Sequence, residues 1–218
     1  MLNMDFSKQI VIRTLDMAWQ PSPAQGVERK PLAREDKESG HATSIVRYAA
    51  GSSFARHTHP QGEEIFVLEG VFSDETGDYP AGSYIRNPPG SAHAPYSKEG
   101  CTLFVKLDQF ANGDNQTVRI HTQQAPWLQG QGGLQVMPLH SYEGEHTALV
   151  KWPENERFLP HRHFGGEEIL VLSGTFRDEH GDYPALTWLR SPHMSQHFPF
   201  VKEETIIWVK TGHLPIDL

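Results

Sequence analysis

The chain contains two copies of one sequence, and this duplication limits its architecture more than any other feature. The stretch that begins at His57 reads HTHPQGEEIFVLEG, and the stretch that begins at His161 reads HRHFGGEEILVLSG. When the chain is shifted by 104 residues, 26 of the 50 positions from His57 to Lys106 match those from His161 to Lys210 without a gap. Because a repeated sequence specifies the same structural unit twice, we expect two similar domains in one chain.

The 218 residues suffice for two domains of about 100 residues each. The polar segment from Ala111 to Gln116 is rich in turn-forming residues and separates the two copies. We therefore predict a first domain over residues 1–112 and a second over residues 113–218.

Short strands are predicted to build each copy. The apolar segments of the first copy cover residues 43–48, 65–68, 83–85 and 102–107, and clusters of Gly, Pro, Asp and Asn separate them. Such runs are typical of β-barrels and sandwiches, and long patterns with a period of 3.6 are absent. The expected fold class is all-β, with two small barrels and at most a helical turn or two.

Charge and composition argue against several partners. The formal net charge is -8 and no basic run occurs, so we expect no nucleic-acid binding. No apolar stretch approaches the roughly 20 residues that span a bilayer, and the first residues do not resemble a secretory leader, so we expect no membrane association and a cytoplasmic location. Cys101 is the single cysteine, which excludes an intrachain disulfide and fits a reducing compartment.

The histidines and glutamates of the repeat indicate metal chemistry. Residues i and i+2 of a strand share a face, so His57 and His59 can point at one spot. Glutamate is seldom buried without a partner, yet Glu63 and Glu64 directly precede the apolar run Ile65–Leu68, so one of them should face inward.

A third histidine, His93, recurs as His197 at the same offset. An isolated HxH pair is more often solvated than ligating, but here every position recurs in both copies. We therefore predict two metal sites, formed by His57, His59, Glu63 and His93 and by His161, His163, Glu167 and His197. Three imidazoles and one carboxylate suit one divalent Fe, Zn, Ni or Mn ion per domain and leave coordination positions open.

These residues resemble the motifs of the cupin superfamily. The first copy fits G-x5-HxH-x3-E-x6-G through Gly51, His57, His59, Glu63 and Gly70, and it fits G-x5-PxG-x2-H through Gly82, Pro88, Gly90 and His93. The second copy keeps the ligands but has Asn155, Leu186 and Met194 where the motif has glycine. The resemblance implies a duplicated cupin, with a jelly-roll or double-stranded β-helix barrel in each domain. Because the first copy keeps the glycines that allow close backbone turns, we expect its site to be the better catalyst if either site is catalytic.

The segment GEEIFVLEGVFSDETGDYP is similar to the cupin domain of ChrR-type anti-sigma factors and of related dioxygenase-like cupins. This similarity implies either a metal-dependent dioxygenase-like enzyme acting on a diketone or aromatic ketone, or a regulatory sensor. A metal-binding scaffold without activity is a third reading. The first 40 residues hold no cysteine for the zinc domain that grips a sigma factor, so a sigma factor is not an expected partner. A small-molecule ligand and a homodimer are compatible with all three readings.

Two further pairs of residues recur with open roles. Arg86 and Arg190 could hold a ligand carboxylate or a substrate anion, or form a salt bridge on the outer face. Asp74 and Asp178 precede Gly77 and Gly181 in a pattern typical of a tight hairpin turn.

Overall fold

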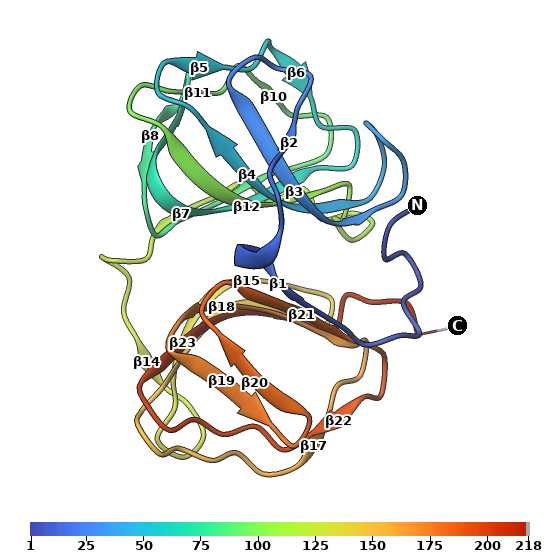
Figure 1. Ribbon diagram of the computed structural model, residues 1–218, viewed down its shortest axis with the longest axis vertical. Helices are drawn as coiled ribbons and strands as arrows, with labels where there is room; N and C mark the ends of the chain where they lie inside the picture. Colours follow the sequence, from blue (N-terminus) through green and yellow to red (C-terminus); the bar gives the residue numbers. More distant parts are fainter. Residues whose placement is uncertain (217–218) are drawn as a thin grey trace. The chain divides into compact units, whose positions relative to one another are not determined.

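The computed structural model describes residues 1–216 of the chain, and its contacts divide the chain into two units (Figure 1). Unit 1 consists of residues 1–4 and 17–125, and unit 2 consists of residues 5–16 together with the chain from Pro126 onward. Both units are built from β-strands, and the described residues contain no α-helix. The predicted all-β fold class is confirmed, with one unit of β-strands for each copy of the repeat.

Unit 1 contains one long sheet and several short strand pairs. Its strands are β2 (Gln20–Pro21), β3 (Val27–Arg34), β4 (Ala42–Tyr48), β5 (Ser52–Ser53), β6 (His57–Thr58), β7 (Glu63–Asp74), β8 (Gly77–Pro80), β9 (Ser83–Asn87), β10 (Ala92–His93), β11 (Tyr96–Ser97), β12 (Cys101–Leu107) and β13 (Val118–His121). The main sheet has the order β13-β9-β7-β12-β4-β3-β2, and β6 pairs with β10. Each apolar segment expected from the sequence lies in a strand: β4, β7, β9 or β12.

Unit 2 repeats this arrangement. Its elements are β1 (Ile10–Arg13), a 3-10 helix η1 (Thr14–Asp16), β14 (Leu128–Gln129), β15 (Gln135–Tyr142), β16 (Glu145–Trp152), β17 (His161–Arg162), β18 (Glu167–Ser173), β19 (Thr175–Asp178), β20 (Gly181–Pro184), β21 (Thr187–Ser191), β22 (Gln196–His197) and β23 (Thr205–Thr211). The sheet order is β1-β21-β18-β23-β16-β15-β14, with β17 paired to β22.

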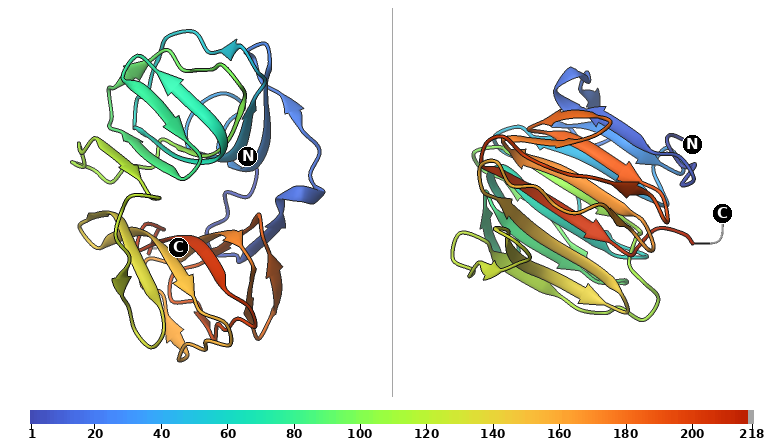
Figure 2. Two further views of the ribbon diagram at one scale, coloured as in Figure 1. Left: turned by 90° about the vertical axis from the view of Figure 1, so that its left-hand side faces the viewer. Right: turned by 90° about the horizontal axis from the view of Figure 1, so that it is seen from below.

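The first strand of each copy joins the sheet of the other copy. Strand β1, near the start of the chain, pairs antiparallel with β21, so the blue strand lies at the edge of the unit 2 sheet (Figure 2). Strand β13, which follows the polar segment between the copies, pairs with β9 of unit 1. The sequence boundary near residue 113 therefore differs from the grouping of the chain by contacts, because two short strands are exchanged.

Alternating strand residues form the interior of each unit. Along β7, Glu63, Ile65 and Val67 share one face, and all three are buried. Unit 1 has a core of Val27, Tyr48, Ile65, Val67, Phe72, Tyr79, Ile85, Cys101, Leu103 and Val105, and unit 2 has a core of Leu134, Trp152, Ile169, Val171, Phe176, Tyr183, Leu189, Val201 and Ile207. Burial of Ile65 and Val67 carries Glu63 inward with them.

None of the helical segments within residues 1–216 is long and apolar enough to cross a membrane.

Candidate metal centres

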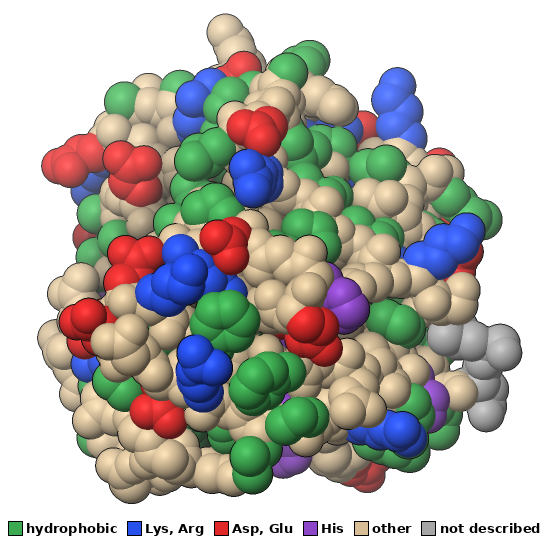
Figure 3. Space-filling model, turned by 60° about the horizontal axis from the view of Figure 1, so that its bottom comes forward, with side chains coloured by type: hydrophobic (Ala, Val, Ile, Leu, Met, Phe, Trp, Pro, Cys, Tyr) green, Lys and Arg blue, Asp and Glu red, His purple; other side chains and the backbone are tan. Residues whose placement is uncertain are grey.

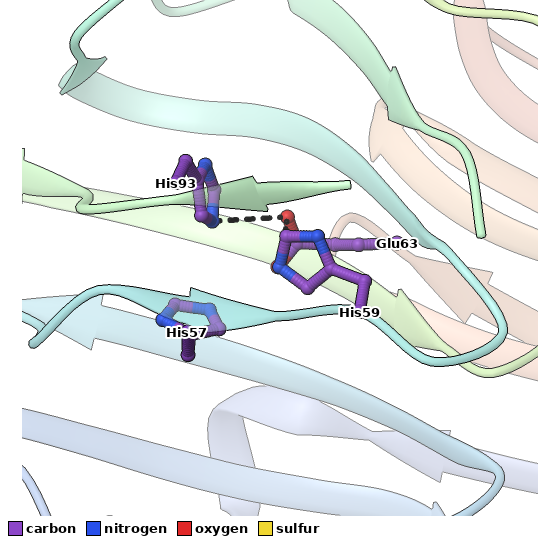
Figure 4. A group of neighbouring side chains, drawn as sticks. All are labelled: His57, His59, Glu63 and His93. Atoms are coloured by element: carbon purple, nitrogen blue, oxygen red, sulfur yellow. Dashed lines mark ion pairs between the residues drawn. The ribbon is translucent and has the colours of Figure 1, made fainter. Parts of the chain in front are cut away.

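The four predicted ligands of the first copy meet at one point inside unit 1 (Figure 4). His57 lies on β6 and His93 on β10, and these residues stand opposite each other in the strand pair. His59 follows β6, and Glu63 begins β7. One ligand atom from each side chain lies within 4.8 Å of the others.

Contacts on the far side of each imidazole ring orient it toward the centre of this group. The Nδ1 atom of His57 lies 2.9 Å from the Ala55 carbonyl oxygen, that of His59 lies 3.1 Å from Ser91 Oγ, and that of His93 lies 3.2 Å from Asp74 Oδ2. A proton on each Nδ1 satisfies these contacts and leaves each Nε2 lone pair free for a metal ion.

The Nε2 atoms of His59 and His93 are buried and have no hydrogen-bond partner among residues 1–216. Each lies 3.4 Å from Glu63 Oε2. Two atoms bound at about 2.1 Å to one metal ion lie about 3.4 Å apart at a tetrahedral angle. Buried nitrogen atoms without partners are costly, so the arrangement fits a divalent ion among these side chains.

The charge states also suit metal binding. Burial lowers the pKa of His59, against the opposing charge of Glu63, so this ring is neutral at neutral pH as a metal ligand must be. Burial acts in the same direction on His93, but the hydrogen bond with Asp74 and the charge of Glu63 outweigh it and raise the pKa of His93. A proton therefore competes with a metal ion more strongly at His93 than at His59.

The second copy assembles the equivalent group in unit 2. Ligand atoms of His161, His163, Glu167 and His197 lie within 4.8 Å of one another. The Nε2 atoms of His163 and His197 are 3.0 Å apart, and they lie 3.5 Å and 3.6 Å from Glu167 Oε2. His161 Nδ1 lies 2.9 Å from the Leu159 carbonyl oxygen, which repeats the contact of His57 with Ala55.

Glu167 differs electrostatically from its counterpart. Burial, together with the charge of Asp178, raises the pKa of Glu167 to about 7, although His197 acts in the opposite direction. In the first group, Asn87 Nδ2 donates a hydrogen bond of 2.9 Å to Glu63 Oε2. Ser191 takes the place of Asn87 in unit 2, so the second carboxylate lacks this amide donor.

A cavity of about 400 Å³ opens from the first group of ligands into the barrel of unit 1. His57, His59 and Glu63 line one part of it. Its walls are largely apolar, and Val46, Phe54, Phe72, Leu103 and Val105 are among the residues that form them. Apolar walls around convergent ligand atoms are the usual form of a small-molecule site.

Apolar side chains are exposed at the end of unit 2 near its ligands, and Figure 3 shows apolar side chains beside histidines on this face. The exposed residues Leu159, Phe164 and Met194 occupy the positions of Ala55, Pro60 and Gly90. The ring of Phe164 also lies 4.9 Å from that of His193, next to Met194. The loops around the second group are therefore bulkier than those around the first.

The buried arginines do not contact the ligand carboxylates. Arg86 donates to Asp114 Oδ2 at 2.5 Å and lies over the Phe110 ring, and its nearest glutamate is Glu64, at 3.8 Å. Arg190 lies over the Phe6 ring and donates to the Asp5 carbonyl oxygen. The expected salt bridge on the outer face is also wrong, because both side chains are buried. Arg86 forms a buried ion pair with Asp114, and both arginines pack on aromatic rings.

Sequence reasoning missed the residues that contact the ligands from behind. Asp74 was predicted only as a turn residue, and it does close the β7–β8 hairpin opposite Gly77, but its other carboxylate oxygen contacts His93. Its recurrence as Asp178, 3.5 Å from His197 Nδ1, was the available signal. Asn87 and Arg119, which donates a hydrogen bond to Asn87 Oδ1, do not recur, so the repeat could not reveal them.

Comparison with known proteins agrees with this fold. The family model described as the ChrR cupin-like domain matches residues 7–111 and again residues 115–215. The chain therefore belongs to the ChrR cupin-like family, as the motifs had predicted, and is a bicupin with two possible metal sites. The comparison with curated proteins found no significant match.

Solved structures of similar fold include three whose names bear on chemistry. A candidate dioxygenase from Nostoc punctiforme aligns with a TM-score of 0.81 at 14% identity, over 94% of this chain and 82% of its own. The pirin YhhW of Escherichia coli, in complex with nickel(II), aligns with a TM-score of 0.71 at 13% identity, over 95% and 99% of the two chains. An oxalate decarboxylase mutant from Bacillus subtilis aligns with a TM-score of 0.64 at 14% identity, over 94% and 76%. At these identities the likeness concerns the fold alone.

Proposed function

We propose that the chain is a metal-dependent, dioxygenase-like enzyme that acts on a small organic substrate, of the diketone or aromatic ketone type, in the barrel of unit 1. The observation that carries this proposal is the cavity of about 400 Å³ that has His57, His59 and Glu63 in its lining. A divalent ion there, with Fe, Zn, Ni and Mn as the candidates, would supply Lewis acidity toward two substrate oxygens and, if redox-active, access to dioxygen.

The residues of the chain would bind and shield the substrate. The apolar side chains of Phe54, Phe72 and Leu103 would contact its hydrocarbon part and exclude water from the metal end of the cavity. The contacts of Ala55, Ser91 and Asp74 with the three imidazoles would keep the ligands in place as substrate enters.

Oxygen consumption tests this proposal directly. Protein freed of metal and then loaded separately with Fe(II), Mn(II), Ni(II) or Zn(II) would be mixed with a panel of β-diketones and hydroxylated aromatic ketones. We expect uptake of dioxygen with loss of at least one panel member, and only with a redox-active ion. Binding of metal without turnover of any panel member would reject the substrate class.

A regulatory sensor is the second candidate, and the match to the ChrR cupin-like family model favours it. In that case the metal centre would respond to an oxidant or a small molecule, and a partner protein would read the change. A shift in metal affinity or melting temperature on addition of ligands, without any turnover, would support the sensor over the enzyme.

A further inference from the structure

Arg119 is the starting point of two hydrogen-bond chains that end on two different ligands of the first group. It lies on β13, the strand at the start of the second copy that pairs with β9 of unit 1. Its Nη1 atom donates to the Arg86 carbonyl oxygen at 2.7 Å, which fixes the guanidinium against the edge of β9. The remaining nitrogens are directed to side chains.

The first chain has one intermediate residue. Arg119 Nη2 donates to Asn87 Oδ1 at 2.6 Å, and Asn87 Nδ2 donates to Glu63 Oε2 at 2.9 Å. The guanidinium can only donate, so it fixes which end of the Asn87 amide is the oxygen. As a result, the NH2 group of Asn87 must face the Glu63 carboxylate.

The second chain runs through the hairpin. Arg119 Nε donates to Tyr79 OH at 3.1 Å, and Tyr79 OH lies 2.6 Å from Thr76 Oγ1. Thr76 Oγ1 donates to Asp74 Oδ1 at 2.5 Å, and Asp74 Oδ2 contacts His93 Nδ1. Every hydroxyl in this chain accepts one hydrogen bond and donates one, so the direction set by Arg119 is consistent throughout.

Unit 2 cannot form the same chains. Ile85 and Leu189 are equivalent positions of the two copies. Arg119 pairs with Ile85, whereas Val11 of β1 pairs with Leu189, and the valine side chain has no hydrogen-bond donor. Ser191 replaces Asn87, and Tyr183 OH donates directly to Asp178 Oδ1 at 2.8 Å. The two sites thus share their ligands and the contact of an aspartate with the third histidine, but unit 2 lacks the chains that begin at Arg119.

We propose that Arg119 is a positioning residue of the first site, which holds Glu63 through Asn87 and His93 through Tyr79, Thr76 and Asp74. The first site then depends on a strand encoded in the second copy of the repeat. This inference rests on the proposed metal function of the first site, and the test below separates the two.

The test measures Co(II) binding to the full chain. A parent carrying His161→Ala and His163→Ala confines binding to the first site, and Co(II) provides both a dissociation constant and a visible absorption spectrum that reports ligand geometry. In this parent, Arg119→Leu is expected to weaken Co(II) binding by about 10- to 100-fold, the usual effect of losing an outer contact to ligands, and to change the spectrum. Lysine has a single ammonium group and cannot reproduce the planar guanidinium that bonds both Asn87 and Tyr79. Arg119→Lys should therefore recover only part of the affinity.

Asn87→Ser provides a second variant in case Arg119→Leu does not fold, because it copies the residue of unit 2 and interrupts only the chain to Glu63. The loss of Co(II) affinity in the Arg119→Leu, Asn87→Ser double variant should be smaller than the sum of the two single losses, because both changes break the chain to Glu63. Arg47→Leu, which removes an exposed arginine of the same unit, is the matched control and should change nothing.

Co(II) affinity within twofold of the parent and an unchanged spectrum in both Arg119→Leu and Asn87→Ser would overturn the positioning role while leaving the metal site intact. A lowered melting temperature with unaltered Co(II) binding would show a purely structural role and would also overturn it. A parent that binds no Co(II) would overturn the metal function and this inference together.

Discussion

Met194 stands in unit 2 where Gly90 stands in unit 1, and both have a left-handed backbone, with φ of 60° and 79°. The same holds for Leu186 and Gly82, at 61° and 84°. The loops of the second copy therefore have the turn geometry of the first copy without the glycines that adopt it without strain. The second copy thus combines a strained backbone at Leu186 and Met194 with four converging ligands.

A pair of substitutions tests this strain. A Cβ atom at Gly90 would meet no heavy atom within 4 Å, so Gly90→Ala changes the backbone energy without a clash. We expect it to lower the free energy of unfolding by about 1 kcal/mol. Met194→Gly should raise it by up to about 1 kcal/mol, because its side chain is 45% exposed and contributes little packing. Urea denaturation of the metal-free protein measures both, and equal effects of the same sign would contradict the account.

The two sites should contribute unequally to any turnover. Glu63→Gln or His93→Ala is expected to reduce activity by more than 100-fold, because the cavity adjoins the first group and a lost ligand costs more than the 10- to 100-fold of an outer contact. Glu167→Gln and His197→Ala should lower metal content but leave most activity. Oxygen-uptake rates together with metal analysis of all four variants check this prediction. The reverse pattern would place catalysis in unit 2.

The cavity itself can be blocked without touching a ligand. Val46 is half-buried on β4 and lines the cavity, so Val46→Phe should fill part of the substrate space. We expect unchanged metal content and at least a tenfold rise in KM or loss of turnover. Val150→Phe, the same change at the equivalent position of unit 2, is the control. If Val46→Phe left the kinetics unaltered, substrate would have to bind elsewhere.

The pKa of Glu167 leads to a prediction on pH. Burial raises it from 4.5 to about 7 in the metal-free protein, so the folded state keeps a proton that the unfolded chain loses above pH 4.5. The stability tied to this group is present at low pH and is lost as the pH rises through about 7. Metal-free Glu167→Gln should therefore match the native protein near pH 5 and melt at a higher temperature near pH 8.

Glu203→Gln, which alters an exposed carboxylate of the same unit, provides the control for this pH experiment. Its melting temperature should follow that of the native protein at every pH. A difference between Glu167→Gln and the native protein that does not change between pH 5 and pH 8 would show that Glu167 is ionised throughout.

Much of this architecture follows from the sequence because both copies carry it. The spacing of His57 and His59 predicts that they converge. The apolar run after Glu63 and Glu64 predicts only that one of them turns inward, and the cupin motif assigns that position to Glu63. The exchange of β1 and β13 was not predictable, since each is a four-residue strand whose partner is set by tertiary packing. Arg119 could not be identified for the same reason: its role exists only once β13 lies beside β9.

The central claim is that each group of three histidines and one glutamate binds one divalent ion. Calorimetric titration of the metal-free full chain with Mn(II) or Co(II) tests it most directly. The account predicts two equivalents per chain, falling to one in the His57→Ala, His59→Ala double variant and to one in the His161→Ala, His163→Ala double variant. No saturable uptake, or a stoichiometry that neither double variant changes, would contradict it.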